Sequence, residues 1–165
     1  MVYLLDASAL ITGDRTSYKI SRWRPFWDWL EHMGRAGVVK IPREQFDEIC
    51  EGTGELVDWL SDDDRREALL LDEEAEVERV RRVASEGYAS NLDDNELAQI
   101  SGDAFLISYA LVAARDRKIV TFEVPKPSKI RANRKIPDVC ASFAIPCCTL
   151  YEMVEELDFT TDWQP

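Results

Sequence analysis

The chain has 165 residues, a length that fits one globular domain. Apolar residues make up 45% of it and charged residues 32%, so it can form a core, and a disordered chain is excluded. The 20 basic and 32 acidic side chains give a net charge of −12, which excludes a protein held to nucleic acid or membrane by bulk positive charge.

The sequence also indicates a reducing, cytoplasmic compartment. Its four cysteines are too few and too irregularly spaced for a disulfide scaffold. Asp6 interrupts the first apolar run before that run could serve as the core of a signal peptide. No apolar stretch approaches the length of about 20 residues that a membrane span needs, so we expect no contact with a membrane.

Four short apolar runs have the length and composition of buried strands. They lie at residues 2–5, 38–41, 119–122 and 147–150. Segments with helical periodicity separate them, and this alternation is typical of a parallel sheet with helices on both faces. The sequence therefore predicts an α/β fold.

Helical periodicity or helix start signals mark five segments between and after these runs. They lie at residues 24–35, 42–50, 73–86, 104–114 and 150–157. The segment at 104–114 is apolar almost all round, as expected of a helix buried against the centre of a sheet. His32, the single histidine, lies in the aromatic helix at 24–35, where we expect it to be structural.

The region at residues 52–101 is the least regular part of the chain. We expect it to be a helical insertion or cap within one domain that spans residues 1–158, with a tail at 159–165. Within it, the apolar run at 69–71 fits either a short edge strand or part of a helix.

Carboxylates follow the predicted strands at the end where open parallel sheets bind their ligands. Asp6 ends the first strand, and Glu123 closes the third. Glu44 and Glu48 lie four residues apart on one helix face, and Asp103 opens the buried helix. Such hard oxygen ligands suit Mg²⁺ or Mn²⁺, which would relieve their repulsion. Each acid taken singly would serve equally well as a helix cap or a solvated side chain.

Five short motifs resemble those of the PIN-domain nuclease superfamily, and together they cover most of the chain. They are YLLDASAL at residues 3–10, IP and EI within 41–49, DAFLISYA at 103–110, IVTFE at 119–123 and IPCCTL at 145–150. Each motif is short, but their order and separations make the match more specific. Within the superfamily the chain looks most like an uncharacterised bacterial branch that resembles toxin ribonucleases.

The resemblance implies a three-layer α/β/α domain with a central parallel sheet. It also implies Mg²⁺- or Mn²⁺-dependent hydrolysis of single-stranded RNA to 5′-phosphate and 3′-hydroxyl ends. By this likeness Asp6, Glu48 and Asp103 would hold the principal metal ion. Glu123 would hold a second ion or its waters, and Ser8 would orient a water or a phosphate oxygen. Because small members of the superfamily are often toxins, an antitoxin protein is an expected partner.

Two departures from the family pattern keep a second function open. Glu123 stands where many members have aspartate, and Glu44 competes with Glu48 for the second position. With an incomplete metal site, the chain would be a catalytically impaired PIN-like module that binds RNA or a protein. A haloacid-dehalogenase-like phosphatase fits less well, because its second aspartate would fall at Ser8.

Residues 117–136 contain seven basic residues and one acid, a local charge of +6 in an acidic chain. Because this stretch surrounds Glu123, we expect an RNA backbone to pass there. The basic residues expected to bind it are Lys126, Lys129, Arg131, Arg134 and Lys135. A solvated loop, or a seat for an acidic partner, fits the same charge.

Three tryptophans cluster around the predicted helix at 24–35: Trp23, Trp27 and Trp29. Their rings could stack on RNA bases. They fit equally with a helix that packs onto the sheet, or onto a second copy of the chain in a homodimer.

Overall fold

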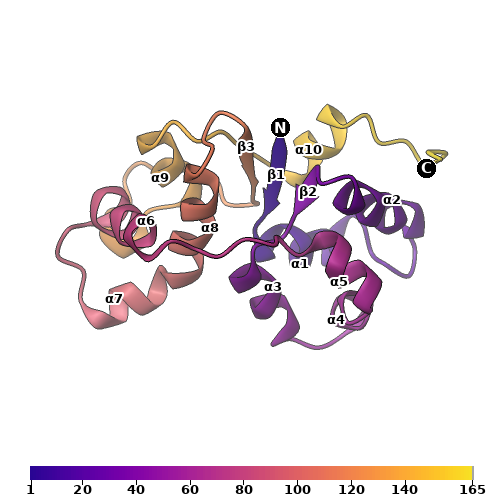
Figure 1. Cartoon of the computed structure of the whole chain (residues 1–165), viewed down its shortest axis with the longest axis horizontal. Helices are drawn as coiled ribbons and strands as arrows, with labels where there is room; N and C mark the ends of the chain where they lie inside the picture. The colour runs from indigo at the N-terminus through magenta and orange to yellow at the C-terminus, as the bar shows by residue number, and fades with distance from the viewer. Residues whose placement is uncertain (165) are drawn as a thin grey trace.

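Four parallel strands form the centre of the computed structural model, which describes residues 1–164. They are β1 (Val2–Leu5), β2 (Val39–Lys40), β3 (Arg117–Val120) and β4 (Cys147–Cys148). Their order across the sheet is β2-β1-β3-β4, so the first strand lies inside and later strands add on both sides (Figure 1). Pro165, the last residue of the expected tail, lies outside the described residues.

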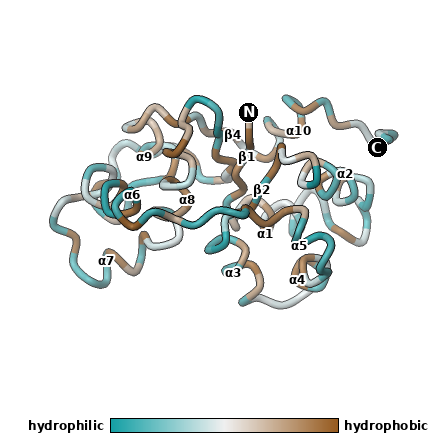
Figure 2. The backbone as a smooth tube through the Cα atoms, viewed as in Figure 1, coloured by the Kyte–Doolittle hydropathy of each residue, from teal (hydrophilic) through white to brown (hydrophobic). Residues whose placement is uncertain are grey.

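The sheet is buried on both faces. Successive side chains of a strand point to opposite faces, and these strands are apolar at consecutive positions. Tyr3 and Leu5 of β1 point into one core cluster, and Leu4 points into the other. Ile119 and Val120 of β3 divide between the two clusters in the same way. The chain therefore has the predicted three-layer α/β/α architecture, with brown, hydrophobic strands at its centre in Figure 2.

One face is covered by helices from the first part of the chain together with the last helix. They are α1 (Ala7–Thr16), α2 (Arg24–Arg35), α3 (Arg43–Cys50), α4 (Glu55–Leu60), α5 (Asp63–Leu69) and α10 (Leu150–Glu156). The tail also contributes to this layer, because Phe159 and Trp163 pack against its core and the Trp163 indole donates to the Pro25 carbonyl oxygen at 2.7 Å.

The other face is covered by the middle of the chain. Its helices are α6 (Val77–Arg82), the π-helix η1 (Val83–Tyr88), α7 (Asp94–Gln99), α8 (Ser101–Leu111) and α9 (Ile136–Ser142), with the 3₁₀ turn η2 (Arg131–Asn133) between β3 and α9. As expected for a helix apolar all round, α8 is the buried member of this layer. Within residues 1–164, no helix is long and apolar enough to cross a membrane.

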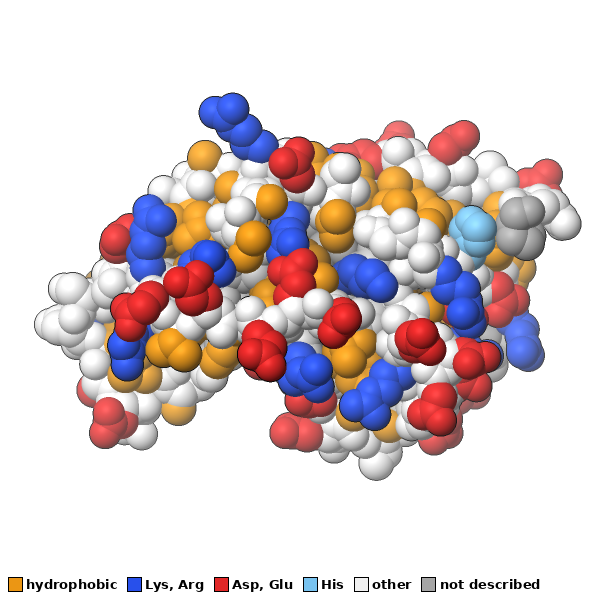
Figure 3. Space-filling model, viewed as in Figure 1, with side chains coloured by type: hydrophobic (Ala, Val, Ile, Leu, Met, Phe, Trp, Pro, Cys, Tyr) orange, Lys and Arg blue, Asp and Glu red, His pale blue; other side chains and the backbone are white. Residues whose placement is uncertain are grey.

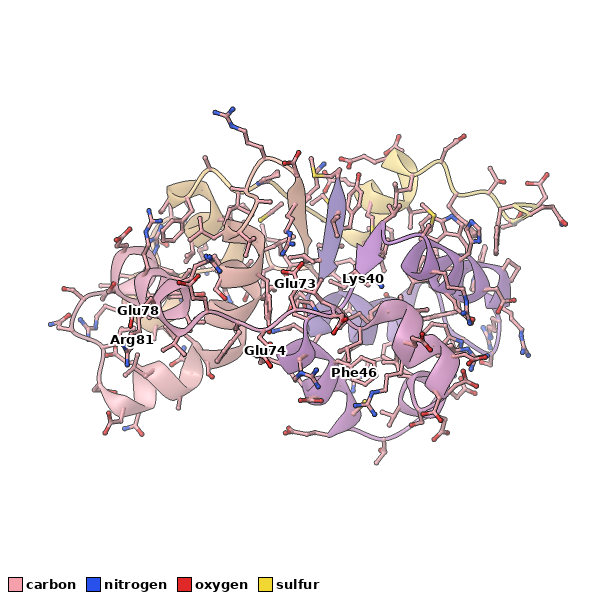
Figure 4. All side chains as sticks on the ribbon, viewed as in Figure 1. Lys40, Phe46, Glu73, Glu74, Glu78 and Arg81 are labelled. Atoms are coloured by element: carbon pink, nitrogen blue, oxygen red, sulfur yellow. The ribbon has the colours of Figure 1, made fainter. Side chains whose placement is uncertain are left out.

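The region at residues 52–101 belongs to both layers and is not a separate cap. Its first half forms α4 and α5 on one face, and its second half forms α6, η1 and α7 on the other. The chain crosses between them in a hydrophilic segment, where Glu73 lies over the middle of the molecule (Figures 2 and 4). Glu73 makes two hydrogen bonds with Arg117, at 2.5 and 2.9 Å, and these tie the crossing to β3.

This crossing corrects the predicted helix at residues 73–86. The helix begins only at Val77, because the residues before it are extended where they pass the sheet. The run at 69–71 is partly helix and partly strand-like, so each of the two predicted structures occurs in it. Leu69 ends α5, and Leu70 makes an isolated parallel bridge with Ile41.

Three strands end earlier than their apolar runs predict. The second occupies Val39–Lys40 in place of 38–41, and Ile41 makes only the isolated bridge with Leu70. The third occupies Arg117–Val120 in place of 119–122, although the Thr121 N–H still donates to the Cys148 carbonyl oxygen at 3.0 Å. The fourth ends at Cys148, because the Thr149 hydroxyl accepts from the Glu152 N–H at 3.2 Å and caps α10. Capping by Thr149 makes Leu150 the first residue of a helix.

Candidate functional site

The carboxyl ends of the strands open into a hollow in the molecular surface. In Figure 1 the arrow of β1 points toward the lower edge of the view, where α3 lies on one side and α7 and the start of α8 on the other. The space-filling view is indented at the same place (Figure 3). The predicted acids are carried on the elements that border this hollow.

Asp6 occupies the N-cap position of α1, but its side chain does not cap the helix. Its Oδ2 atom accepts hydrogen bonds from the hydroxyls of Ser8 and Thr121, the second at 2.7 Å. The side chain is only 6% exposed, and this burial raises the pKa of Asp6, while the two hydroxyls partly oppose the rise. The position of Asp6 is therefore not explained by capping.

Replacing Thr121 with Val tests this support. The variant is expected to lose roughly 1.5–3 kcal/mol of stability at a pH where Asp6 is ionised, because a buried carboxylate loses a donor. Urea unfolding at alkaline pH with EDTA measures the loss. Thr121→Ser keeps the hydroxyl and is the matched control, and equal losses in the two variants would contradict a hydrogen-bonding role.

Glu48 reaches the same edge from α3. Glu48 as a whole is exposed. Its carboxyl group is partly buried, and this burial raises the pKa of Glu48, with smaller contributions from the charges of Asp6 and Glu51. A β-carbon added at Gly102 would lie 3.7 Å from Glu48 Oε2, which places this carboxylate beside the residue that precedes Asp103. Glu48 therefore lies where α3 meets the start of α8.

Glu44 faces elsewhere, and this settles which glutamate of α3 joins the cluster. Its Oε1 atom lies 3.5 Å from the Tyr109 hydroxyl, and burial and the charge of Glu44 raise the pKa of Tyr109 to about 12. The charge of Asp6, in contrast, adds to the raised pKa of Glu48. The structure therefore places Glu48, and not Glu44, with the other acids.

Asp103 lies in the first turn of α8, facing η1. The Tyr88 hydroxyl donates to Asp103 Oδ2 at 3.3 Å. Burial raises the pKa of Asp103 to about 7, and the charges of Asp6, Glu123 and Glu48 add to this rise. Because Asp103 senses the other three acids, the four carboxylates share one electrostatic environment.

Glu123 stands at the edge of this group and is held by contacts from α9. Its Oε1 atom accepts from the Lys135 ammonium, and its Oε2 atom accepts from the Ile136 backbone N–H at 2.7 Å. Its own N–H donates to the Thr121 hydroxyl at 3.1 Å. Both carboxylate oxygens are thus already engaged by the protein.

Two further residues that support the site are not apparent from the sequence. Gln45 is fully buried and links two walls, since it accepts from the Ala7 N–H at 2.9 Å and donates to the Gly102 carbonyl oxygen at 3.0 Å. Tyr88 reaches Asp103 from the π-helix. The one signal for Gln45 in the sequence is that it shares a helix face with the apolar residues Phe46 and Ile49.

The donor set fits a divalent cation at Asp6, Glu48 and Asp103. These are hard carboxylate oxygens, and burial together with mutual repulsion raises their pKa values, a cost that a cation relieves. Across residues 1–164, no three His, Cys, Asp or Glu side chains already stand at ligand distances from one point. The fit therefore rests on two properties of the three residues: their carboxylate oxygens are the donor atoms that such ions prefer, and they lie on elements that border the same edge of the sheet. Glu123 fits less well, because Lys135 and Ile136 hold it.

The five basic residues expected to bind RNA differ in their surroundings. Arg131 makes two hydrogen bonds with Glu96, at 2.6 and 2.8 Å, and Arg134 donates to the carbonyl oxygens of Gly87 and Asp138. These arginines hold the loop onto α7, η1 and α9. Lys126 and Lys129 are exposed.

A cavity of about 280 Å³ joins the acidic and basic parts of the site. Asp103 and Glu123 lie on its acidic side. Lys129, Arg134 and Lys135 supply positive charge, and the remaining lining residues are Gln99, Ala132 and Asn133. The cavity can thus receive a group that carries negative charge and binds a cation.

Fold and site together define the class of this protein: a three-layer α/β/α domain with a carboxylate cluster at the carboxyl edge of its parallel sheet. The chain belongs to the family described as a domain of unknown function, DUF4411, whose match covers residues 3–161. The matched range includes both helical layers and all four carboxylates. Neither curated proteins nor solved structures gave a match to the chain.

Proposed function

We propose that this protein is a Mg²⁺- or Mn²⁺-dependent endoribonuclease that hydrolyses single-stranded RNA. The observation that carries the proposal is the gathering of Asp6, Glu48 and Asp103 from three separate segments at one sheet edge. The charge of Asp6 contributes to the raised pKa values of the other two. The motifs that resemble PIN-domain nucleases supply the same three residues, and that likeness makes RNA the preferred substrate.

Each residue has a role in this proposal. Asp6, Glu48 and Asp103 would hold the ion, which would supply charge stabilisation and a more acidic water. Ser8 and Thr121 fix the Asp6 carboxylate, and Tyr88 supports Asp103. Hydrolysis joins the oxygen of one water to phosphorus and breaks the P–O3′ bond. One proton of that water ends on the departing 3′ oxygen, so the products are a 3′-hydroxyl and a 5′-phosphate.

The surface around the site offers contacts for a single strand. Lys126 and Lys129 are exposed in the loop that follows Glu123, and Lys129 lines the same cavity as Glu123, so both can meet phosphates. Tyr151 is exposed on α10, and its ring centroid lies 5.4 Å from that of Phe122, the residue before Glu123. An exposed aromatic ring that packs against the residue before Glu123 suits an unpaired base.

A binding module without catalysis is the second candidate, and one observation favours it. Glu123 is held by Lys135 and by the Ile136 N–H, so each oxygen of the fourth acid already accepts a hydrogen bond from the protein. Such a module would hold RNA or a protein partner through the same surface. Calorimetric titration that shows no uptake of magnesium or manganese would favour this candidate.

The biological role that we propose is that of the toxin in a toxin–antitoxin pair, acting in the cytoplasm. The four cysteines are free thiols, which suits a reducing compartment. An antitoxin protein would then be the partner that restrains cleavage. This role rests on the likeness to toxin ribonucleases.

Cleavage of a labelled single-stranded RNA by the purified protein tests the function. With manganese we expect cutting that EDTA abolishes and that Asp6→Asn lowers by roughly 10³-fold, because several kcal/mol of charge stabilisation is lost. Undiminished cutting by Asp6→Asn would contradict the proposal. Induced expression of the same pair in a bacterial host tests the toxin role, which requires the wild type alone to slow growth.

A further inference from the structure

Lys135 and Glu123 form an ion pair within the candidate site, beside the carboxylates of the proposed metal centre. The Lys135 ammonium donates to Glu123 Oε1, and the Ile136 N–H donates to Glu123 Oε2 at 2.7 Å. Both contacts come from consecutive residues at the start of α9, so the fold presents them together. Glu123 is thereby neutralised by the chain itself.

The ammonium also lies near Asp103. Lys135 and Asp103 line the same cavity. The hydrogen bond to Glu123 raises the pKa of Lys135, and the charges of Glu123 and Asp103 add to this rise. Asp103 has no basic side chain among its hydrogen-bond partners in residues 1–164, where Tyr88 is its donor. Lys135 therefore places a positive charge in the cavity that Glu123 and Asp103 share.

We propose that the Lys135 ammonium takes the place of a second divalent ion. The site would then bind a single Mg²⁺ or Mn²⁺ through Asp6, Glu48 and Asp103, and Lys135 would contact a phosphate oxygen of the RNA in the adjoining cavity. This inference rests on the proposed ribonuclease function.

The charge balance supports one ion. Once Lys135 neutralises Glu123, three carboxylates remain, and one divalent ion offsets most of their charge. A second ion beside Glu123 would have to displace an ammonium and stand close to it, which like-charge repulsion opposes. Lys129 and Arg134 add positive charge to the same cavity and suit it to a phosphate.

Calorimetric titration with manganese alone tests this inference through the number of ions bound. We expect one ion for the wild type and two for Lys135→Met, in which Glu123 loses its ammonium partner. The double variant Glu123→Gln/Lys135→Met removes both charges with little change of volume and should return to one ion. Lys126→Met is the matched control, because it removes an exposed charge from the same loop and should bind one ion.

Cleavage provides the second measurement. Lys135→Met should lower kcat/KM by roughly 10²-fold, the scale expected for a donor lost at the developing charge. Two ions in the wild type would overturn the inference and leave the ribonuclease proposal intact. Unchanged stoichiometry together with unchanged cleavage in Lys135→Met would also overturn it. Absence of manganese binding in the wild type would remove the proposed function itself and this inference with it.

Discussion

Asp103→Asn is expected to make the metal-free protein more stable than the wild type at pH 8. Burial and neighbouring carboxylates raise the pKa of Asp103 to about 7. Between pH 4 and 7 the folded state therefore holds a proton that the unfolded state releases, so stability falls as the pH rises through this range. A rise of this pKa from its usual value near 4 to about 7 corresponds to roughly 4 kcal/mol, and asparagine avoids this loss because it does not ionise.

Urea unfolding of both proteins with EDTA, at pH 5 and pH 8, measures this difference. The gap between variant and wild type should widen in favour of the variant at pH 8. Adding magnesium at pH 8 should stabilise the wild type and have little effect on the variant, because a bound ion stabilises only the state that binds it. If the free energy of unfolding changed with pH in the same way in both proteins, the ionisation of Asp103 would not be the cause of the loss of stability.

Trp27→Ala is expected to cost about 3–5 kcal/mol, the range for deleting a large aromatic ring from a core. Trp27 is 1% exposed, packs against Trp59 with ring centroids 5.1 Å apart, and donates its indole N–H to the Tyr18 carbonyl oxygen. The variant leaves a cavity and an unpaired carbonyl in the layer built on α2. A marked fall in the urea midpoint would be the observed result.

Trp23→Ala provides the comparison. Trp23 precedes α2 and is 40% exposed, so its removal should change stability by about 0.5 kcal/mol or less. Equal losses from Trp23→Ala and Trp27→Ala would mean that burial does not separate the two rings. Of the three tryptophans considered for base stacking, Trp27 and Trp29 are buried, and Trp23 alone keeps a surface for a ligand.

The layer architecture could be predicted because it depends on local patterns. The first strand and the helix at Arg24–Arg35 lie where their patterns place them. The predicted helix at 73–86 began too early because the contact that holds the crossing segment extended joins Glu73 to Arg117, far along the chain. The third strand was predicted two residues too late in the chain. The apolar pattern assigns Phe122 to the strand, but its ring packs against Tyr151 and it lies beyond the end of β3.

The candidate site was predictable where it follows from the sheet. The rule that strand ends meet at one edge predicted that Asp6, Glu48 and Asp103 lie near one another, and in the structure the charge of Asp6 adds to the raised pKa values of the other two. The partners of charged side chains were not predictable. Lys135 belongs to Glu123, and Arg131 to a glutamate 35 positions away, since ion pairs depend on the finished tertiary structure.

The order of strands in the sheet has a consequence for synthesis of the protein. Asp6 and Glu48 emerge early from the ribosome, but β3, the inner neighbour of β1, and the Thr121 hydroxyl that holds Asp6 come much later. A growing chain thus contains Asp6 and Glu48 long before it contains Asp103 and the framework that brings the three together. On the proposed function, the messenger and ribosomal RNA around a nascent chain would meet no working nuclease until translation has passed β3.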